Sequence, residues 1–126
     1  MNYEDLAKQA SEKAYSPYSK IKVGAVVLTD NNEHFLGCNV ENASFGATVC
    51  AERNAIFQAV AAGHTSINHV YVYSDKGFPP CGLCRQVIKE FSHEKTKVTI
   101  IDSNFNKKTI NFSELLPHSF NKDFLD

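Results

Sequence analysis

The sequence TVCAERNAIFQAVAA at residues 48–62 is followed by the apolar run HVYVYS at residues 69–74 and by CGLCRQVIKEF at residues 81–91. Small and apolar side chains recur at helical spacing in the first and third of these segments, which predicts two helices. The middle segment has the Val- and Tyr-rich composition of a buried strand. A strand between two helices favours parallel pairing with right-handed crossovers, so this stretch predicts the centre of an α/β fold.

The sequence on either side of this centre predicts the remaining elements. Thr48 is the expected N-cap of the first helix, and Gly63 is its expected left-handed C-terminal cap. Together with the central segments, the expected elements make an α/β fold, a three-layer α/β/α sandwich with a mixed five-stranded sheet. The outer elements are a helix at Tyr3–Tyr15, an antiparallel hairpin of Val23–Thr29 and His34–Val40, strands at Lys97–Ile101 and Lys108–Phe112, and a short helix at Ser113–Leu116.

Length and composition limit the functions that need to be considered. The 126 residues suit a single domain over 1–126, and 43% hydrophobic residues exclude a disordered tail. A formal net charge of -1 argues against a strongly basic nucleic-acid platform. No apolar stretch has the length of a membrane span, and the polar first five residues lack the pattern of a secretory signal. We therefore expect a cytoplasmic protein with neither a membrane nor a polynucleotide as partner.

Three cysteines carry the pattern of a metal site. Cys50, Cys81 and Cys84 each lie at or near the start of a predicted helix, where free N–H groups and the helix dipole favour the thiolate. Cys81 and Cys84 can hold one ion, and Cys50 can supply a third sulfur. Zinc in structural sites has four protein ligands, whereas catalytic zinc has three and one open position. Glu52 follows Cys50 by two residues and is the natural group to transfer protons there.

Two other interpretations of the cysteines remain open at this stage. Cys38 could complete a structural zinc site of four cysteines, or Cys81 and Cys84 could form a redox pair. Neither interpretation gives Glu52 a role. Cys38 lies inside a predicted strand, and we expect it to be a buried small hydrophobic residue.

Six short motifs together resemble the short, tetrameric class of cytidine deaminases. The zinc-deaminase signature of three cysteines and a glutamate that is not a ligand accounts for part of the match. The resemblance covers nearly the whole chain, from about Leu6 to Phe120. The motifs are SPYSK at 16–20, VGA at 23–25, GCNVENAS at 37–44, CAER at 50–53, PCGLCRQ at 80–86, and LLP at 115–117 with Phe120.

The resemblance implies a zinc ion in each subunit, bound by Cys50, Cys81 and Cys84. Glu52 would take a proton from the activated water, deliver it to N3 of the pyrimidine and help ammonia to leave. Arg53 would lie against the thiolates. Three thiolates leave Zn²⁺ with a net charge of about -1, and a guanidinium that donates to sulfur would restore its pull on water.

The resemblance also implies how the substrate is bound. Asn39 and Glu41 would hydrogen-bond the ribose, and the backbone of Ala51 would contact the base carbonyl. Phe120 would pack on the base in a neighbouring subunit of a homotetramer with shared active sites. Ile21 stands where the family usually has a Phe that stacks on the pyrimidine, so the ring would have an aliphatic cover.

Several other side chains are assigned from the resemblance, in the case of Phe45, or from the sequence pattern. Phe45 stands where many relatives have Tyr, which would remove a hydrogen bond between subunits. The role of Arg85 stays open. We expect Phe105 and Phe112 in the core. Surface or loop positions are expected for His34, His64, His69, His93 and His118.

The resulting hypothesis is hydrolytic deamination of cytidine and 2′-deoxycytidine to uridine and 2′-deoxyuridine in pyrimidine salvage. The substrate would be a free nucleoside because the chain has no basic stripe for a polynucleotide backbone. A deaminase for another aminated ring shares the zinc chemistry, and a substrate panel separates the two. A zinc-binding interaction module without catalysis is the other alternative, and it would release no ammonia.

Overall fold

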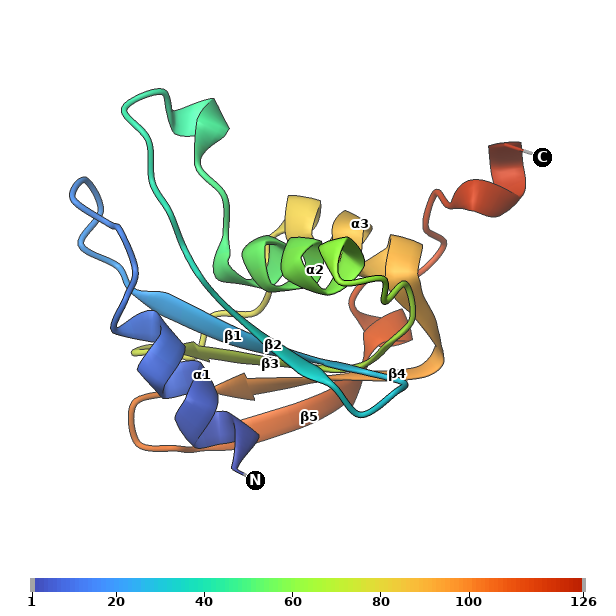
Figure 1. Cartoon of the computed structure of the whole chain (residues 1–126), viewed down its shortest axis with the longest axis horizontal. Coiled ribbons are helices and arrows are strands. Elements are labelled where there is room, and N and C mark those ends of the chain that lie inside the picture. Colours follow the sequence, from blue (N-terminus) through green and yellow to red (C-terminus); the bar gives the residue numbers. More distant parts are fainter. Residues whose placement is uncertain (1, 126) are drawn as a thin grey trace.

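The structure, a computed structural model, describes residues 2–125 and has one mixed sheet with helices on both faces (Figure 1). The expected α/β sandwich with five strands is confirmed. In chain order the elements are α1 (Tyr3–Ser11), β1 (Val23–Thr29), β2 (His34–Cys38), the short 3-10 helix η1 (Phe45–Ala47), α2 (Ala51–Ala61), β3 (Ile67–Ser74), α3 (Gly82–Phe91), β4 (Ser92–Ile101), β5 (Lys107–Asn111), and the 3-10 helices η2 (Phe112–Glu114) and η3 (Lys122–Leu125).

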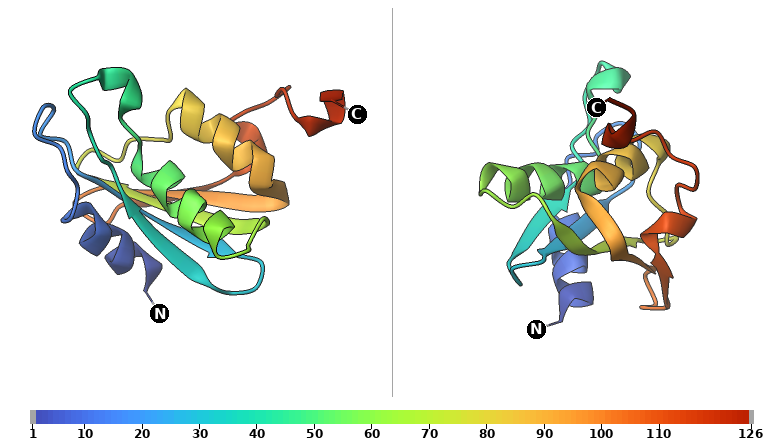
Figure 2. Two further views of the ribbon diagram at one scale, coloured as in Figure 1. Left: turned by 45° about the horizontal axis from the view of Figure 1, so that its top comes forward. Right: turned by 90° about the vertical axis from the view of Figure 1, so that its right-hand side faces the viewer.

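The order of strands in the sheet is β2-β1-β3-β4-β5. Strands β3 and β4 are parallel and joined through α3, as the helix-flanked central strand predicts, while the other neighbouring pairs are antiparallel. Helix α1 covers one face, and α2 and α3 lie together on the other (Figures 1 and 2). The two helices that carry the candidate metal ligands therefore share one face.

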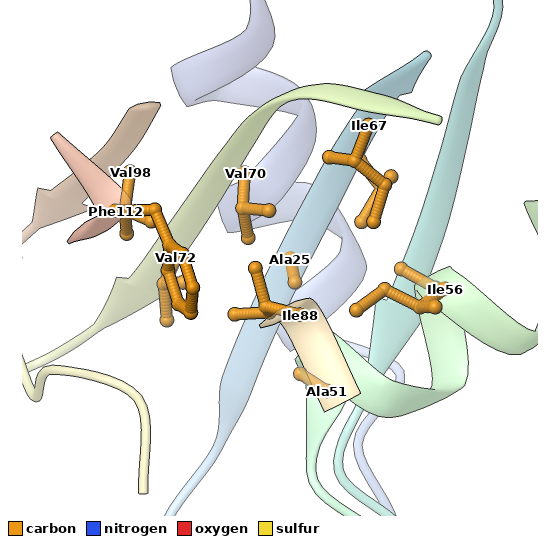
Figure 3. Close-up of a cluster of buried hydrophobic side chains, with 11 residues drawn as sticks. Ala25, Ala51, Ile56, Ile67, Val70, Val72, Ile88, Val98 and Phe112 are labelled. Atoms are coloured by element: carbon orange, nitrogen blue, oxygen red, sulfur yellow. The ribbon is translucent and has the colours of Figure 1, made fainter. Parts of the chain in front are cut away.

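The main core lies between the sheet and the α2–α3 layer (Figure 3). Ala51 and Ala55 of α2 are completely buried, and their small side chains let the helix approach the sheet closely. The glycines of the β1–β2 hairpin extend this close approach to both faces. A Cβ atom at Gly24 would lie 1.9 Å from the carbonyl oxygen of Ala7 in α1, and one at Gly37 would lie 2.3 Å from that of Ala51 in α2.

Helix α2 begins later than Thr48, and the N-cap predicted there is wrong. Cys50 is the N-cap residue, and the Thr48 hydroxyl instead accepts a hydrogen bond from the Asn42 backbone N–H at 3.1 Å. Val49 is held extended because its backbone exchanges two hydrogen bonds with Val40. This pairing prevents the helix from beginning before Cys50. Gly63 does adopt the left-handed conformation expected after the helix, with a φ of 94°.

Other predicted boundaries shift by a few residues, and some side chains are placed differently. Helix α1 ends at Ser11 rather than Tyr15, and strand β2 ends at Cys38 rather than Val40. Phe112 is buried, but Phe105 is 40% exposed in the β4–β5 turn, so its assignment to the core is wrong. His34, His69 and His93 lie within β2, β3 and β4 and are partly buried, contrary to the expected surface or loop positions.

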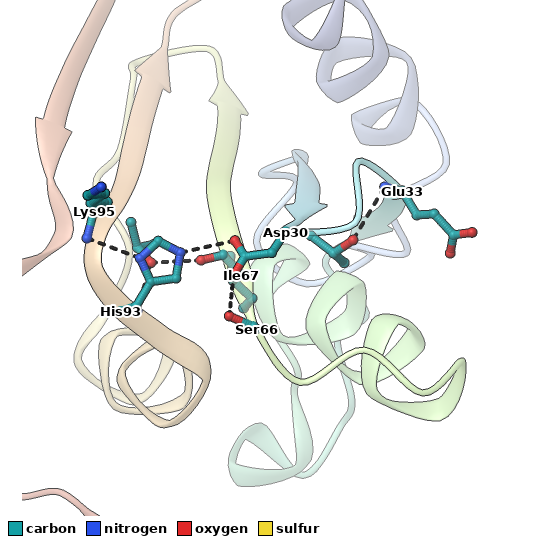
Figure 4. Close-up of polar contacts among 8 residues, drawn as sticks. Asp30, Glu33, Ser66, Ile67, His93 and Lys95 are labelled. Atoms are coloured by element: carbon teal, nitrogen blue, oxygen red, sulfur yellow. Dashed lines mark hydrogen bonds and ion pairs between the residues drawn. The ribbon is translucent and has the colours of Figure 1, made fainter.

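A polar network joins three strands where β3 begins (Figure 4). The Asp30 carboxylate accepts hydrogen bonds from the Ser66 hydroxyl at 2.5 Å and from His93 Nε2 at 3.0 Å. The Lys95 backbone N–H donates to His93 Nδ1, which leaves Nε2 as the protonated nitrogen. Because the serine donates to the aspartate rather than to the histidine, the trio is a structural tie and not a nucleophile–base pair.

Candidate active site

Three cysteine sulfurs meet at the amino-terminal ends of α2 and α3. Cys50 and Cys81 are the N-cap residues of these helices, and Cys84 lies in the first turn of α3. The three Sγ atoms all lie within 4.8 Å of one another. Cys50 and Cys81 have Sγ atoms 3.7 Å apart. The spacing of the motif and the shared sheet face thus bring together the three residues predicted from the sequence.

The geometry of the sulfur cluster fits zinc. A tetrahedral site with Zn–S distances of about 2.3 Å separates its sulfurs by about 3.8 Å. Cys84 is buried and Cys81 is exposed, so one side of the cluster faces solvent. Over residues 2–125, no fourth His, Cys, Asp or Glu side chain joins the three. Three soft donors with one open side match a catalytic zinc site better than a closed structural one.

Cys38 lies on the other face of the sheet. It pairs with Gly24, whose missing side chain would point into α1, and pleating places paired residues on the same face. Its carbonyl oxygen accepts a hydrogen bond from Asn54 Nδ2 at 2.8 Å. Cys38 is partly buried, and burial raises the pKa of its thiol. The fourth cysteine is therefore outside the cluster, whereas a structural four-cysteine site would need it inside.

The metal-free cluster favours one thiolate, at Cys50. A hydrogen bond from the Cys84 thiol, assisted by those from Arg53 and Cys81, lowers the pKa of Cys50 to about 5. The same bond and burial raise the pKa of Cys84. Arg53 Nη2 lies 3.6 Å from Cys50 Sγ and 3.5 Å from the Thr48 carbonyl oxygen. The buried Nε of Arg53 has no hydrogen-bond partner within the described chain.

Glu52 lies in the first turn of α2 and is only 4% exposed. Burial removes water from its carboxylate and raises the pKa of Glu52 in the metal-free protein to about 7, and the negative charge of Cys50 adds to the rise. The hydrogen bond from the backbone N–H of Glu52 itself and the positive charge of Arg53 oppose this shift. A carboxyl group that titrates near neutral pH can both accept and return a proton.

A groove of about 380 Å³ lies beside η1. Glu41 accepts hydrogen bonds there from the backbone N–H groups of Tyr18 and Ser19, at 3.0 and 3.1 Å, and from the Ser19 hydroxyl. The bond from the Ser19 side chain is the main cause that lowers the pKa of Glu41. The lining residues are Tyr18, Ser19, Glu41, Asn42, Phe45 and Thr48.

Asn39 is 8% exposed and its side chain bonds the backbone beside it. Its Oδ1 atom accepts from the Val23 N–H, and its Nδ2 donates to the Ile21 carbonyl, both at 2.8 Å. The amide keeps one hydrogen and one lone pair for another partner. Asn39 thus holds in place the segment that carries Ile21, which is 44% exposed.

The carboxy-terminal segment carries the last predicted site residue. Phe120 is 59% exposed and stacks on Phe124, with ring centroids 5.9 Å apart. Two residues with contacts that the sequence reasoning missed hold this segment against α3. Gln86 donates to the Phe120 carbonyl at 3.0 Å, and Arg85 donates to the Leu115 carbonyl at 3.0 Å. Both lie in the motif that supplies two of the cysteines. Their place in that motif is the one feature of the sequence that could have drawn attention to them.

The chain is similar to known proteins of one family. Residues 2–100 match the family model described as cytidine and deoxycytidylate deaminase zinc-binding region. A cytidine deaminase of Mycoplasma genitalium is 43% identical over 97% of this chain and 98% of its own length. One from Sporosarcina psychrophila is 40% identical over 94% of this chain and 89% of its own.

Solved structures give the same result. The crystal structure of a cytidine deaminase from Burkholderia pseudomallei has a TM-score of 0.90 and 40% identity, over 94% of this chain and 96% of that one. The cytidine deaminase of Mycobacterium tuberculosis has a TM-score of 0.82 and 32% identity, with 94% of each chain covered. Between residues 2 and 125, every helix is too short or too polar to cross a bilayer. The chain belongs to the cytidine and deoxycytidylate deaminase family.

Proposed function

We propose that this chain catalyses the hydrolytic deamination of cytidine and 2′-deoxycytidine, which yields uridine or 2′-deoxyuridine and ammonia. The observation that carries the proposal is the buried carboxyl group of Glu52 in the helix turn that begins at Cys50, beside a cluster of three cysteines open on one side. The names of the relatives at about 40% identity support cytidine as a substrate.

Cys50, Cys81 and Cys84 are the residues that would hold zinc, one ion in each subunit. Bound zinc lowers the pKa of a water molecule and makes it a nucleophile towards C4 of the base. Glu52 would take a proton from this water and deliver it to N3 of the pyrimidine while the oxygen adds to C4. It would then carry the remaining proton of that oxygen to the amino group, so that the C4–N bond breaks, ammonia leaves and the C4 carbonyl of the product forms. Burial, which raises the pKa of Glu52, makes its carboxylate a stronger base for the first of these transfers.

Arg53 acts on the charge of the cluster. Its guanidinium is 3.6 Å from Cys50 Sγ, so it withdraws electron density from a thiolate ligand. A ligand set with less negative charge leaves the metal a stronger acid. The buried Nε of this arginine has no hydrogen-bond partner within residues 2–125, so it keeps a donor for a second acceptor.

The groove at Glu41 is the proposed ribose site. Glu41 and Asn39 would bind the sugar hydroxyls, chiefly the 3′-hydroxyl, and the backbone of Ala51 would meet the base carbonyl. Ile21 would cover the pyrimidine from its own subunit. Phe120, exposed on a segment beside α3, would cover it from a neighbouring subunit of a homotetramer. We place the reaction in pyrimidine salvage, and the free thiols of the site suit the reducing cytoplasm.

A deaminase for another aminated ring is the second candidate function. It would need the same cysteines and Glu52, but not a groove with a carboxylate acceptor for sugar hydroxyls. The ionised Glu41 at that groove therefore favours a nucleoside. A zinc-binding module without catalysis has no use for a buried carboxyl group next to the cluster.

The experiment is to incubate the purified protein with cytidine, follow ultraviolet absorbance and ammonia, and measure zinc on the same sample. Parallel reactions use 2′-deoxycytidine, free cytosine and an aminated purine nucleoside. We expect turnover of the two pyrimidine nucleosides and a zinc content near one per chain. Zinc without ammonia from any substrate would support the non-catalytic module, and preference for a base without sugar would support the second candidate.

A further inference from the structure

Arg85, whose role the sequence leaves open, joins two distant parts of the backbone. It is the fourth residue of α3 and is partly buried. Its Nε donates a hydrogen bond to the Pro80 carbonyl oxygen at 2.7 Å, and its Nη1 donates to the Leu115 carbonyl oxygen at 3.0 Å. Hydrogen bonds from an ionised donor are roughly twice as strong as neutral ones. One side chain therefore bridges the loop before Cys81 and the segment after β5.

The bond to Pro80 bears directly on Cys81. Pro80 is buried, and the first backbone hydrogen bond of α3 runs from the Arg85 N–H to the Cys81 carbonyl, so the helix does not satisfy the Pro80 carbonyl. Buried carbonyl groups need a partner, and Arg85 supplies it. The peptide group that joins Pro80 to Cys81 is planar, so fixing its oxygen fixes the direction in which Cys81 leaves the loop.

The bond to Leu115 gives the arginine a fixed support. Leu115 and Leu116 pack against the main core, and the chain then continues past α3 to its carboxy-terminal end (Figure 2). The neighbouring Gln86 donates to the Phe120 carbonyl at 3.0 Å. Helix α3 thus holds the carboxy-terminal segment at two places, through Arg85 and Gln86. Arg85 also bonds the loop before Cys81.

We propose that Arg85 is a positioning residue that sets the place of the Cys81 thiolate in the metal site, and that the carboxy-terminal segment supports it there. This rests on the proposed function, in which Cys81 is a zinc ligand. The two arginines of the site then have different tasks. Arg53 contacts a ligand sulfur and changes its charge, whereas Arg85 contacts carbonyl oxygens and determines geometry. A lysine, with one ammonium group, cannot reproduce the two-sided contact.

The test uses the full chain loaded with zinc, as the parent protein and as three variants: Arg85→Met, Arg85→Lys and Lys89→Met. Lys89 lies one turn further along α3, so Lys89→Met is a matched loss of positive charge on the same helix. Transfer of zinc to an excess of a chromogenic chelator is timed. The visible spectrum of the Co²⁺-substituted forms reports ligand geometry, and unfolding of the metal-free forms reports stability.

Arg85→Met should release zinc about 10- to 100-fold faster, the usual effect of losing a group that orients a ligand. Its Co²⁺ absorption bands should shift, which a purely stabilising residue would not cause in the folded protein. Arg85→Lys should fall between this variant and the parent because an ammonium group can retain one carbonyl. Lys89→Met should match the parent in both measurements.

Parental zinc release and a parental Co²⁺ spectrum in Arg85→Met would overturn the proposal, as would an equal acceleration in Lys89→Met. If Arg85→Met does not fold, Arg85→Lys decides, and parental values there overturn the proposal. The assay follows the metal and not ammonia. A parent protein that binds zinc without deaminating cytidine would remove the proposed activity and leave this test intact.

Discussion

Gly37 in β2 lies directly beneath Ala51, the first residue of α2, and a Cβ atom at position 37 would be 2.3 Å from the Ala51 carbonyl oxygen. It would also be 2.5 Å from the Ala55 backbone nitrogen. Because both atoms belong to the backbone of α2, the rotation of a side chain cannot relieve the clash. The start of the helix that carries Cys50 and Glu52 is therefore seated on a glycine.

Gly37→Ala should push the start of α2 away from the sheet. Overpacking of this kind typically costs about 1–3 kcal/mol, and here it should also reduce zinc content because Cys50 moves. Gly46→Ala is the matched control, since a Cβ atom there meets nothing within 4 Å. Urea unfolding and zinc analysis check both variants. Equal stability and equal zinc in Gly37→Ala and Gly46→Ala would contradict the close approach.

Glu52→Gln keeps the size of the side chain and removes its ability to transfer protons. It should keep the fold and the zinc, and its kcat for cytidine should fall by about 10²–10⁴-fold, the usual contribution of a positioned acid–base group. Ammonia release and zinc content are measured on one sample. Turnover within a few-fold of the parent would remove Glu52 from the mechanism.

Cys38→Ala should retain both zinc and deaminase activity. Its sulfur belongs to the sheet face covered by α1, and the three clustered sulfurs lie on the face of α2 and α3. Zinc content and initial rate with cytidine are the measurements, with Cys84→Ala as the variant that should lose the metal. Loss of zinc from Cys38→Ala would restore the four-cysteine structural site.

Glu41→Ala should raise KM for cytidine and leave the turnover of free cytosine, at whatever level the parent has, nearly unchanged. The carboxylate is the proposed acceptor for the ribose, but it also binds Tyr18 and Ser19 of the adjacent loop. Ser19→Ala separates these roles because it loosens the loop and keeps the carboxylate. The sugar assignment fails if Glu41→Ala keeps the parental preference for cytidine over cytosine.

His69 should make the folded state sensitive to acid. Burial lowers the pKa of His69, and Lys97 of β4 lowers it further, while Glu4 of α1 opposes the shift. Its Nε2 lies 2.7 Å from Thr99 Oγ1. Because the folded pKa is below the unfolded value of about 6.5, the unfolded state binds the proton first, and stability falls as pH drops below that value.

His69→Gln keeps a hydrogen-bonding side chain without this titration. Urea unfolding at about pH 7.5 and about pH 5.5 should show a smaller loss of stability in the variant than in the parent, with both proteins in the same zinc state. An identical pH dependence in the two proteins would assign the acid sensitivity to other groups.

Much of the sheet could be predicted because its strands have a local signal. Val23–Thr29 is rich in β-branched residues and forms β1 with the predicted bounds. The parallel pair followed from the alternation of strand and helix. The start of α2 was predicted wrongly, although Thr48 is a good capping residue, because the backbone pairing of Val40 with Val49 across the η1 loop keeps Val49 extended. Phe105 was placed in the core as an aromatic residue, but the β4–β5 turn leaves it 40% exposed.

The metal cluster was predictable for a different reason. Two helices that follow loops on the same face bring their amino-terminal ends together, so the spacing of Cys50, Cys81 and Cys84 was enough. The contacts of Asn39 and Arg85 could not be predicted, since both side chains bond backbone groups whose position depends on the completed fold. Side chains that bind carbonyl oxygens leave no pattern of matched residue types in the sequence.

The cluster of sulfurs also bears on the integrity of the chain. Cys50 and Cys81 are 31 positions apart, and the central strand β3 lies between them. An ion that joins them closes a loop of about 31 residues, and by the chain-entropy argument for disulfides such a closure is worth about 3–4 kcal/mol. A zinc ion bound there would act as a removable cross-link across the middle of the protein. Its removal by a chelator would end the proposed reaction and would also lower the free energy of unfolding.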